Sequence, residues 1–128
     1  MINKQWLSFA EEDYLALLSL WEQELPLYRI ICFHAQQYAE KILKGLLAER
    51  NITPPRIHDI IKLSKLCQRV DIQVPLSKDD QALLSSVYID TRYPLDAGLL
   101  PDGEPSMEDA KIIIEIVKKL KQWVDENK

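Results

Sequence analysis

Apolar residues recur at helical spacing in five separate segments, and this pattern constrains the fold more than any other feature of the chain. Such spacing gives a helix one apolar face, whereas a half-buried strand would need strict alternation of apolar and polar residues. The pattern predicts helices at about 4–23, 27–50, 57–70, 78–89 and 107–126.

Prolines and serine caps separate these segments. Pro26, the stretch "NITPP", Pro75 and the loop "RYPLDAGLLPDGEP" interrupt the helical pattern. Ser77 and Ser106 each precede an acidic residue by three positions, which is typical of a helix N-cap. Short connections imply antiparallel neighbours. We therefore expect an all-α, up-and-down helical bundle of four long helices plus a shorter helix, forming one domain over residues 1–128.

Composition limits the classes of protein to which the chain can belong. A hydrophobic content of 47% over 128 residues supports a packed core. No apolar run is long enough for a membrane span, and no secretory signal opens the sequence, so we expect a cytoplasmic protein with no membrane partner. Cys32 and Cys67 lie on apolar faces, where buried free thiols are expected and a disulfide or metal pair is the alternative. We expect no metal and no cofactor.

Charge is unevenly distributed along the chain. Residues 28–70 carry eight Lys and Arg against three Asp and Glu, and residues 71–110 carry two against nine. A basic region can bind an anionic partner such as RNA or a nucleotide phosphate. Two oppositely charged regions can equally pair within the fold or across a dimer, so the charge pattern leaves both interpretations open.

Asp13 interrupts the apolar face of the first predicted helix, between Phe9 and Leu17. An unpaired carboxylate inside a protein is too costly to persist. We therefore expect Asp13 to be buried and to contact a cationic or hydrogen-bonding group from the second helix or from residues 90–93.

Four polar side chains fall together on one face of the second predicted helix, namely His34, Gln37, Lys41 and Lys44. Lysine supplies point charges for phosphate, and histidine and glutamine supply hydrogen-bond donors. An ordinary solvated face is the alternative. The stripe itself contains no carboxylate, with Glu40 beside it, and this favours an anion-binding surface.

The stretch "YIDTRYP" places Asp90, Thr91, Arg92 and Tyr93 at the expected end of the fourth helix. Pro94 disfavours helical geometry at the preceding residue. Arginine beside tyrosine suits a nucleotide, since one binds phosphate and the other stacks on a base. Arg92 at a helix C-terminus also has a purely structural explanation, because it complements the helix dipole.

The stretch "HDI" opens the third predicted helix with His58 and Asp59. Asp59 complements the helix N-terminus, and His58 is a hydrogen-bonding side chain. No serine or cysteine is placed nearby for a catalytic triad, and three scattered glycines exclude a dinucleotide-binding fingerprint.

Together, "WLSFAEEDYLALL", "CFHAQQYAEKILKGLL", "HDI" and "YIDTRYP" resemble the prokaryotic HEPN domain over about residues 6–124. The resemblance implies a single helical domain that often dimerises. It also implies a partner, since family members are commonly encoded beside a minimal nucleotidyltransferase, often as a toxin–antitoxin pair. Some members were described as the nucleotide-binding half of that pair.

Other HEPN proteins are metal-independent ribonucleases that use an arginine and a histidine separated by four to six residues. This chain departs from that pattern, because Arg92 is followed by Tyr93 and Pro94 and no histidine follows His58. Arg29 and His34 have the spacing but lie at the start of the second helix rather than at the motif's usual place.

Three hypotheses follow. The first is a nucleotide- or RNA-binding partner of a minimal nucleotidyltransferase, with His34, Gln37, Lys41, Lys44, Arg92 and Tyr93 as ligand-binding residues and Asp13, His58, Asp90 and Thr91 supporting them. The second is a ribonuclease toxin, and the third is a purely structural dimerisation module. DNA is not expected as a ligand. Under the first hypothesis, Arg92 should lie within about 10 Å of Lys41 or His34, a typical helix-packing distance. We expect a homodimer, with Phe33, Tyr38 and Trp123 at its interface.

Overall fold

The computed structural model describes residues 1–87 and 104–128, and every regular element in these ranges is a helix. The helices are α1 (Lys4–Glu22), α2 (Tyr28–Glu49), α3 (Ile60–Arg69), α4 (Lys78–Ser86) and α5 (Met107–Glu126). No strand occurs among these residues, which confirms the all-α fold class.

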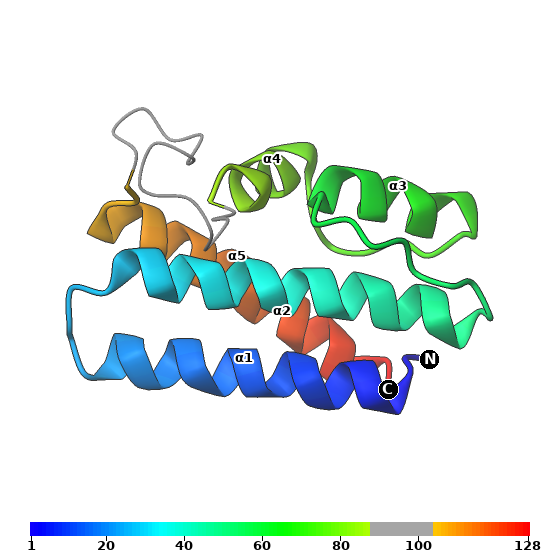
Figure 1. Cartoon of the computed structure of the whole chain (residues 1–128), viewed down its shortest axis with the longest axis horizontal. Coiled ribbons are helices and arrows are strands. Elements are labelled where there is room, and N and C mark those ends of the chain that lie inside the picture. The colour runs from blue at the N-terminus through cyan, green and yellow to red at the C-terminus, as the bar shows by residue number, and fades with distance from the viewer. Residues whose placement is uncertain (88–103) are drawn as a thin grey trace.

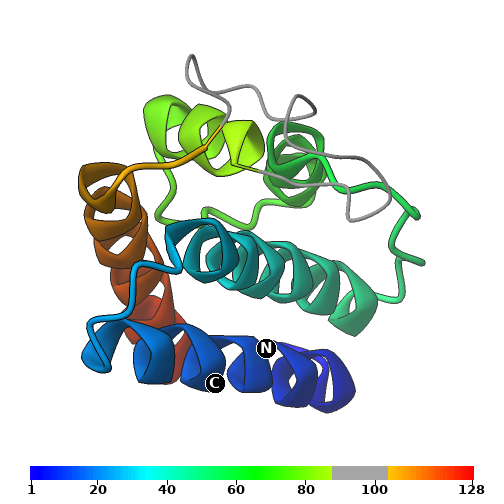
Figure 2. The same cartoon turned by 60° about the vertical axis from the view of Figure 1, so that its left-hand side comes forward.

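The helices surround α2. In Figure 1, α1 and α2 lie side by side and run in opposite directions, α5 crosses them obliquely, and α3 and α4 lie on the other side of α2 from α1. The rotated view in Figure 2 shows the same arrangement. Helix α2 contacts each of the other four helices, so it forms the centre of the bundle.

The lengths of the helices differ from the expected layout. Helices α1, α2 and α5 contain 19, 22 and 20 residues, whereas α3 and α4 contain 10 and 9. The described residues therefore form three long and two short helices rather than four long and one short. Helix α3 begins three residues later than predicted because the Asp59 side chain accepts from Lys62 N and acts as its N-cap. The predicted end of α4 lies outside the described residues.

Capping boxes begin α4 and α5, as the sequence predicted. Ser77 accepts from the backbone N–H of Asp80, and the Asp80 carboxylate accepts from the backbone N–H of Ser77. Ser106 and Asp109 make the same reciprocal pair of hydrogen bonds at the start of α5. Each box satisfies two backbone donors that the helix leaves unpaired. The bounds predicted for α5 are confirmed in full.

Helix α2 is buried on several faces. Thirteen of its 22 residues are buried, including polar Gln36, Glu40 and Lys44. A surface helix buries one stripe, whereas a helix enclosed by four neighbours buries most of its circumference. The polar residues of α2 must therefore find partners inside the protein.

The chain before α1 packs against α2 at Gly45. Asn3 N donates to Gly45 O at 3.1 Å, and Ile2 is buried beside it. A Cβ atom on Gly45 would lie 2.8 Å from both Ile2 Cγ1 and Trp6 Cβ, closer than real contacts allow. Glycine at this position lets the start of α1 approach the backbone of α2.

Both cysteines are free and fully buried, as expected. Burial raises the pKa of the Cys32 thiol to about 12, with a further contribution from Asp109. Burial likewise raises the pKa of Cys67 to about 11. Because the thiolate is the reactive form, these side chains serve as core residues.

Two assignments of apolar residues were wrong. Tyr38, expected at a dimer interface, is fully buried inside the chain and packs on Tyr14 with ring centroids 5.3 Å apart. Phe9, expected on the buried stripe of the first helix, is 44% exposed. Phe33 and Trp123 are partly buried. Within residues 1–87 and 104–128, no helix is both long and apolar enough to cross a lipid bilayer.

Candidate functional site

Two clusters of polar side chains lie along α2, each built around a buried carboxylate. We call Asp13, His34 and Lys41 the Asp13 cluster. We call Glu40, Gln36, Lys44 and His58 the Glu40 cluster. Together with Gln37, which adjoins Gln36, they form the polar belt.

The Asp13 cluster connects α1 to α2. Asp13, which is 7% exposed, accepts from His34 Nδ1 at 2.8 Å through Oδ1 and from Lys41 Nζ at 2.5 Å through Oδ2. Both carboxylate oxygens are therefore satisfied by α2. The expectation that Asp13 is buried and bound to a cation of the second helix is confirmed. A carboxylate only accepts, so His34 carries its proton on Nδ1 in this arrangement.

The Glu40 cluster connects α2 to the segment before α3. Glu40, which is 4% exposed, accepts from Lys44 Nζ at 3.1 Å through Oε2. Its Oε1 accepts from His58 Nδ1 at 2.9 Å and from Gln36 Nε2 at 3.3 Å. A buried carboxylate with three donors satisfies the requirement that interior charges be paired.

Two glutamines complete the belt. Gln36 Nε2 also donates to the backbone carbonyl of His58 at 3.2 Å, which fixes the segment before α3 against α2. Gln37 Nε2 donates to Gln36 Oε1 at 2.9 Å. The position of His58 therefore depends on α2 through both its ring and its backbone.

The two clusters differ in their exposure to solvent. The side chains of His34 and Lys41 are 26% and 25% exposed, and that of His58 is 52% exposed. Lys44 is only 8% exposed. An external ligand can therefore contact His34, Lys41 and His58, whereas Lys44 is enclosed.

The structure changes the interpretation of the predicted polar stripe. Its cations are neutralised by Asp13 from α1 and by Glu40, so the belt balances two lysines with two carboxylates when both histidines are neutral. Lys44 Nζ also lies 6.0 Å from the centre of the Trp6 ring, a cation–π distance. Lys44 is thus a structural cation inside the bundle.

Asp90, Thr91, Arg92 and Tyr93 lie outside the described residues. The expected distance of about 10 Å from Arg92 to Lys41 or His34 therefore stays a prediction.

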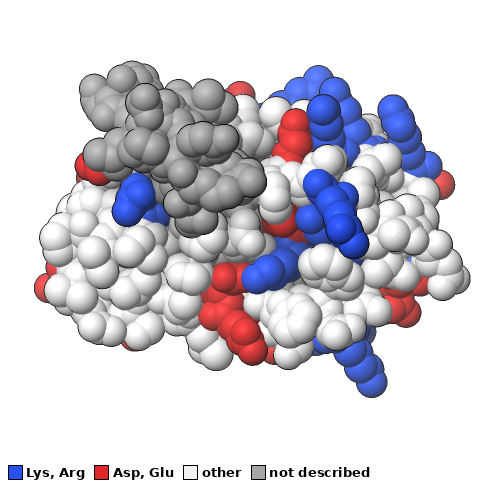
Figure 3. Space-filling view, viewed as in Figure 1, with Lys and Arg blue, Asp and Glu red and all other residues white. Residues whose placement is uncertain are grey.

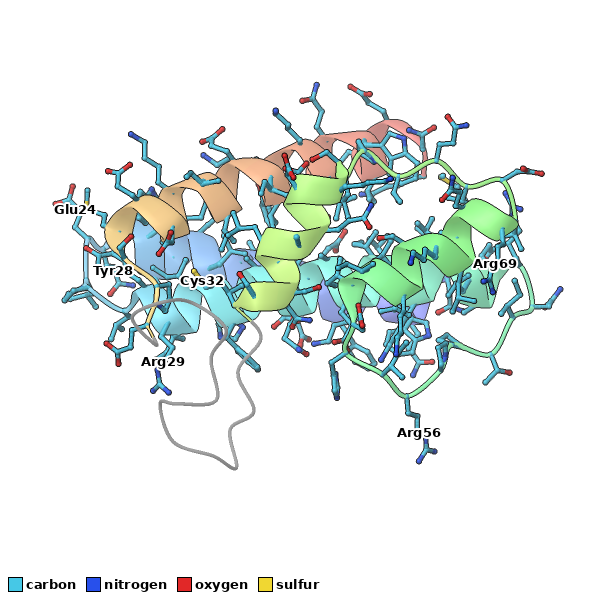
Figure 4. The ribbon with its side chains drawn as sticks, turned by 90° about the horizontal axis from the view of Figure 1, so that it is seen from above. Glu24, Tyr28, Arg29, Cys32, Arg56 and Arg69 are labelled. Carbon is cyan, nitrogen blue, oxygen red and sulfur yellow. The ribbon has the colours of Figure 1, made fainter. Side chains whose placement is uncertain are left out.

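Basic side chains occur around the belt. In Figure 4, Arg29 and Arg56 point away from the helices on the same side of the molecule. The space-filling view in Figure 3 faces that side, and basic side chains gather there over α2 and α3 with acidic ones between them. Arg29 and Arg56 are both exposed. This face offers several cations to an anionic ligand.

Arg29 and His34 lie on the same helix but on different sides of it. A separation of five residues in an α-helix corresponds to a rotation of about 140°. His34 Nδ1 is held by Asp13, and its ring lies edge-on to Phe33 with centroids 5.4 Å apart. Among the described residues, no group of His, Cys, Asp and Glu side chains could hold a metal ion.

Sequence reasoning did not place Glu40 and Gln36 in the site. A signal existed, because Gln36, Glu40 and Lys44 follow one another at intervals of four residues and Glu40 lies next to Ala39. This spacing brings Glu40 into contact with Gln36 and Lys44 on the same helix, next to the apolar core residue Ala39. The same argument that identified Asp13 therefore applies to Glu40.

Comparison with known proteins supports the same type of fold. The sequence model of the HEPN domain matches residues 3–127. Among solved structures, the chain is similar to TT1696 from Thermus thermophilus, with 28% identity and a TM-score of 0.70 over 96% of this chain and 95% of that one. No curated protein matches the sequence.

Proposed function

Since this chain belongs to the HEPN family, we propose that it is a nucleotide- or RNA-binding partner of a minimal nucleotidyltransferase, in a pair of the toxin–antitoxin type. The observation that carries the proposal is the Asp13 cluster, in which a buried carboxylate holds a histidine and a lysine at the surface. Side chains fixed in advance lose little conformational entropy when a ligand binds.

The chemistry of the cluster suits a phosphate group. Asp13 occupies only one of the three donors of Lys41, so two donors remain for an oxyanion. His34 donates to Asp13 through Nδ1, so Nε2 of the neutral ring can accept from a hydroxyl of the ligand. Gln37 and His58 belong to the same belt, and the arginines of the same face add positive charge. We propose His34, Lys41 and Gln37 as ligand-binding residues, with Arg92 and Tyr93 contributing a forked cation and a stacking ring.

Binding is tested with a fluorescein-labelled single-stranded RNA and a fluorescent ATP analogue in anisotropy titrations. The variant is the double substitution Asp13→Asn and Lys41→Gln, which keeps the interior pair neutral. The matched control is Asp59→Asn with Lys62→Gln, which makes the same change of charge at the N-cap and in the first turn of α3. We expect binding to fall at least tenfold in the first variant alone, and to fall with rising salt in the wild type. Unchanged binding in a folded first variant would contradict the proposal.

The nucleotidyltransferase partner is tested separately. The adjacent reading frame should encode a small nucleotidyltransferase, and the two chains should co-purify after co-expression. A neighbouring frame of another class, with no nucleotidyltransferase retained by this chain, would contradict the partnership while leaving ligand binding intact.

A second candidate function is metal-independent ribonuclease activity, favoured by the hydrogen bond between His34 and Asp13. His34 held by Asp13 resembles a general base with its orienting carboxylate. Arg29 is an exposed cation on a different side of α2, so the spacing of Arg29 and His34 does not by itself form a catalytic pair. Cleavage of RNA in the presence of EDTA, lost in both His34→Ala and Arg29→Gln, would support this function. Binding without cleavage would favour the first proposal, and neither activity would favour a structural module.

We also propose that the chain forms a homodimer. Leu25, Leu27, Ile30 and Met107 are 37–51% exposed, and the end of the molecule where α1 joins α2 is largely uncharged in Figure 3. Clusters of exposed apolar residues commonly mark interfaces. Light scattering should report a dimer at micromolar concentration, and a Leu27→Glu and Met107→Glu variant should be monomeric. Leu15→Glu, at an isolated exposed leucine on α1, is the control and should stay dimeric.

A further inference from the structure

A cavity of about 560 Å³ lies between α3, the start of α4 and the segment that joins them. Residues 72–76 of that segment return beside α3, as Figure 4 shows from above. None of the described lining residues belongs to the polar belt. Its volume falls within the range of sites for small molecules, about 300–1,000 Å³.

Ser64 contributes an unsatisfied polar atom to this cavity. The residue is 5% exposed and lines the cavity, and its hydroxyl has no hydrogen-bond partner among the described residues. Native proteins rarely leave a buried hydroxyl without a partner. Because Tyr38 and Ser85 also carry such a hydroxyl and do not line the cavity, the Ser64 hydroxyl by itself does not identify a ligand.

The charged residues that line the cavity are both lysines. Lys65 comes from α3 and Lys78 from the first turn of α4, and the described lining contains no acidic side chain. Neither lysine forms an ion pair with a described residue, in contrast to Lys41 and Lys44 of the belt. Two such cations beside one cavity favour an anionic ligand.

The remaining lining combines apolar and amide groups. Ile61, Ile72, Val74 and Leu76 provide apolar surface. Gln81 Nε2 donates to Leu76 O at 2.9 Å and holds the joining segment against α4. Gln68 and Gln73 add amide groups that can both donate and accept. A mostly apolar wall with a few convergent polar groups is typical of a site for small molecules.

We propose that this cavity binds a small organic anion, whose apolar body lies on Ile72 and Val74 and whose carboxylate or phosphate lies between Lys65 and Lys78. The site is separate from the polar belt, so it does not depend on the function proposed above.

The probes are 1-naphthylacetate, 1-naphthyl phosphate and the neutral 1-naphthalenemethanol, each titrated into the ¹⁵N-labelled protein. We expect the anions to shift the amide resonances of residues 61–81 and to bind at least tenfold more tightly than the alcohol. Whichever of the two anions binds with the higher affinity identifies the anionic group that the site prefers, carboxylate or phosphate.

Three variants test the assignment. Lys65→Gln with Lys78→Gln should weaken anion binding at least tenfold, whereas Lys118→Gln with Lys119→Gln, the same change of charge on α5, should not. Ser64→Leu should block the cavity, and the lysine variants decide the outcome if that protein does not fold. The proposal is overturned if the shifts map elsewhere, if the alcohol binds as tightly as the anions, or if the first lysine pair binds like the wild type.

Discussion

The Asp13 and Glu40 clusters use the same types of group, a carboxylate, a histidine and a lysine, in two different ways. Asp13 receives both partners from another helix, and both partners reach solvent. Glu40 receives its lysine from its own helix, and that lysine is buried. The first arrangement leaves its histidine and lysine partly exposed, whereas the second encloses its lysine and exposes only His58. Under the function proposed above, the first arrangement would serve ligand binding and the second the architecture of the bundle.

This difference follows from the position of each carboxylate. Asp13 lies at the boundary between α1 and α2, where lysine and histidine side chains can extend from the contact toward water. Glu40 lies on the face of α2 that meets the segment before α3. Gln36 donates both to Glu40 and to the His58 carbonyl of that segment. Because water reaches the Asp13 cluster, the loss of one partner there can be compensated by solvent more readily.

The largest effect is expected from Glu40→Ala. The substitution leaves the Lys44 ammonium buried without its counter-charge and removes the acceptor of both His58 and Gln36. The free energy of unfolding should fall by about 3–5 kcal/mol, as for other buried pairs that lose one partner. Urea denaturation followed by circular dichroism measures this change. A companion variant, Glu40→Gln with Lys44→Met, removes both charges and should recover most of the lost stability. If Glu40→Ala lowers the free energy of unfolding by less than about 1 kcal/mol, Lys44 is not a buried charge that depends on Glu40.

A smaller loss is expected from Asp13→Ala, about 2–3 kcal/mol. Lys41 and His34 lose their acceptor, but each is about a quarter exposed and can turn toward water. The measurement is the same denaturation experiment under identical conditions. If Asp13→Ala costs as much as Glu40→Ala or more, solvent does not compensate the Asp13 cluster and the two clusters are equally sealed.

Much of the fold could be predicted because its signals are local. Ser106 and the acidic residue three positions later define the start of α5 wherever the helix packs. The start of α3 was misplaced because Ile57 continues the apolar pattern, although Asp59 is a favoured N-cap residue and marked the true boundary. Local hydrogen bonding outweighed hydrophobic periodicity at that point.

The site was harder to predict than the fold. Asp13 was identified because a carboxylate between apolar neighbours must have a partner, and α2 provides it. Tyr38 was misassigned because a single apolar stripe assumes one buried face, whereas α2 is enclosed on several. His58 joins Glu40 from 18 residues away, a contact that depends on how the segment before α3 folds back. No periodicity within one helix encodes such a contact.

A third prediction compares the two histidines. His34→Ala should lower the free energy of unfolding by about 1 kcal/mol, because a hydrogen bond to a charged acceptor is lost at a partly exposed site. His34→Ala should also weaken RNA or nucleotide binding. His58→Ala should weaken that binding less, because His58 belongs to the Glu40 cluster. Denaturation and anisotropy titrations on both variants measure these effects. Stronger loss of binding in His58→Ala would move the ligand site toward Glu40.

The smallest effect should come from exchanging lysine for arginine in each cluster. Lys41→Arg should change the free energy of unfolding by no more than about 0.5 kcal/mol, because a side chain a quarter exposed has room for the larger guanidinium group beside Asp13. Lys44→Arg should cost about 1–3 kcal/mol, since the guanidinium must fit between Glu40 and the Trp6 ring inside a packed interior. Both variants keep the positive charge. A difference between their changes in the free energy of unfolding therefore reports how tightly each lysine is enclosed. Equal changes in the free energy of unfolding would mean that Lys44 is no more confined than Lys41. The two clusters would then not differ in how tightly they enclose their lysines.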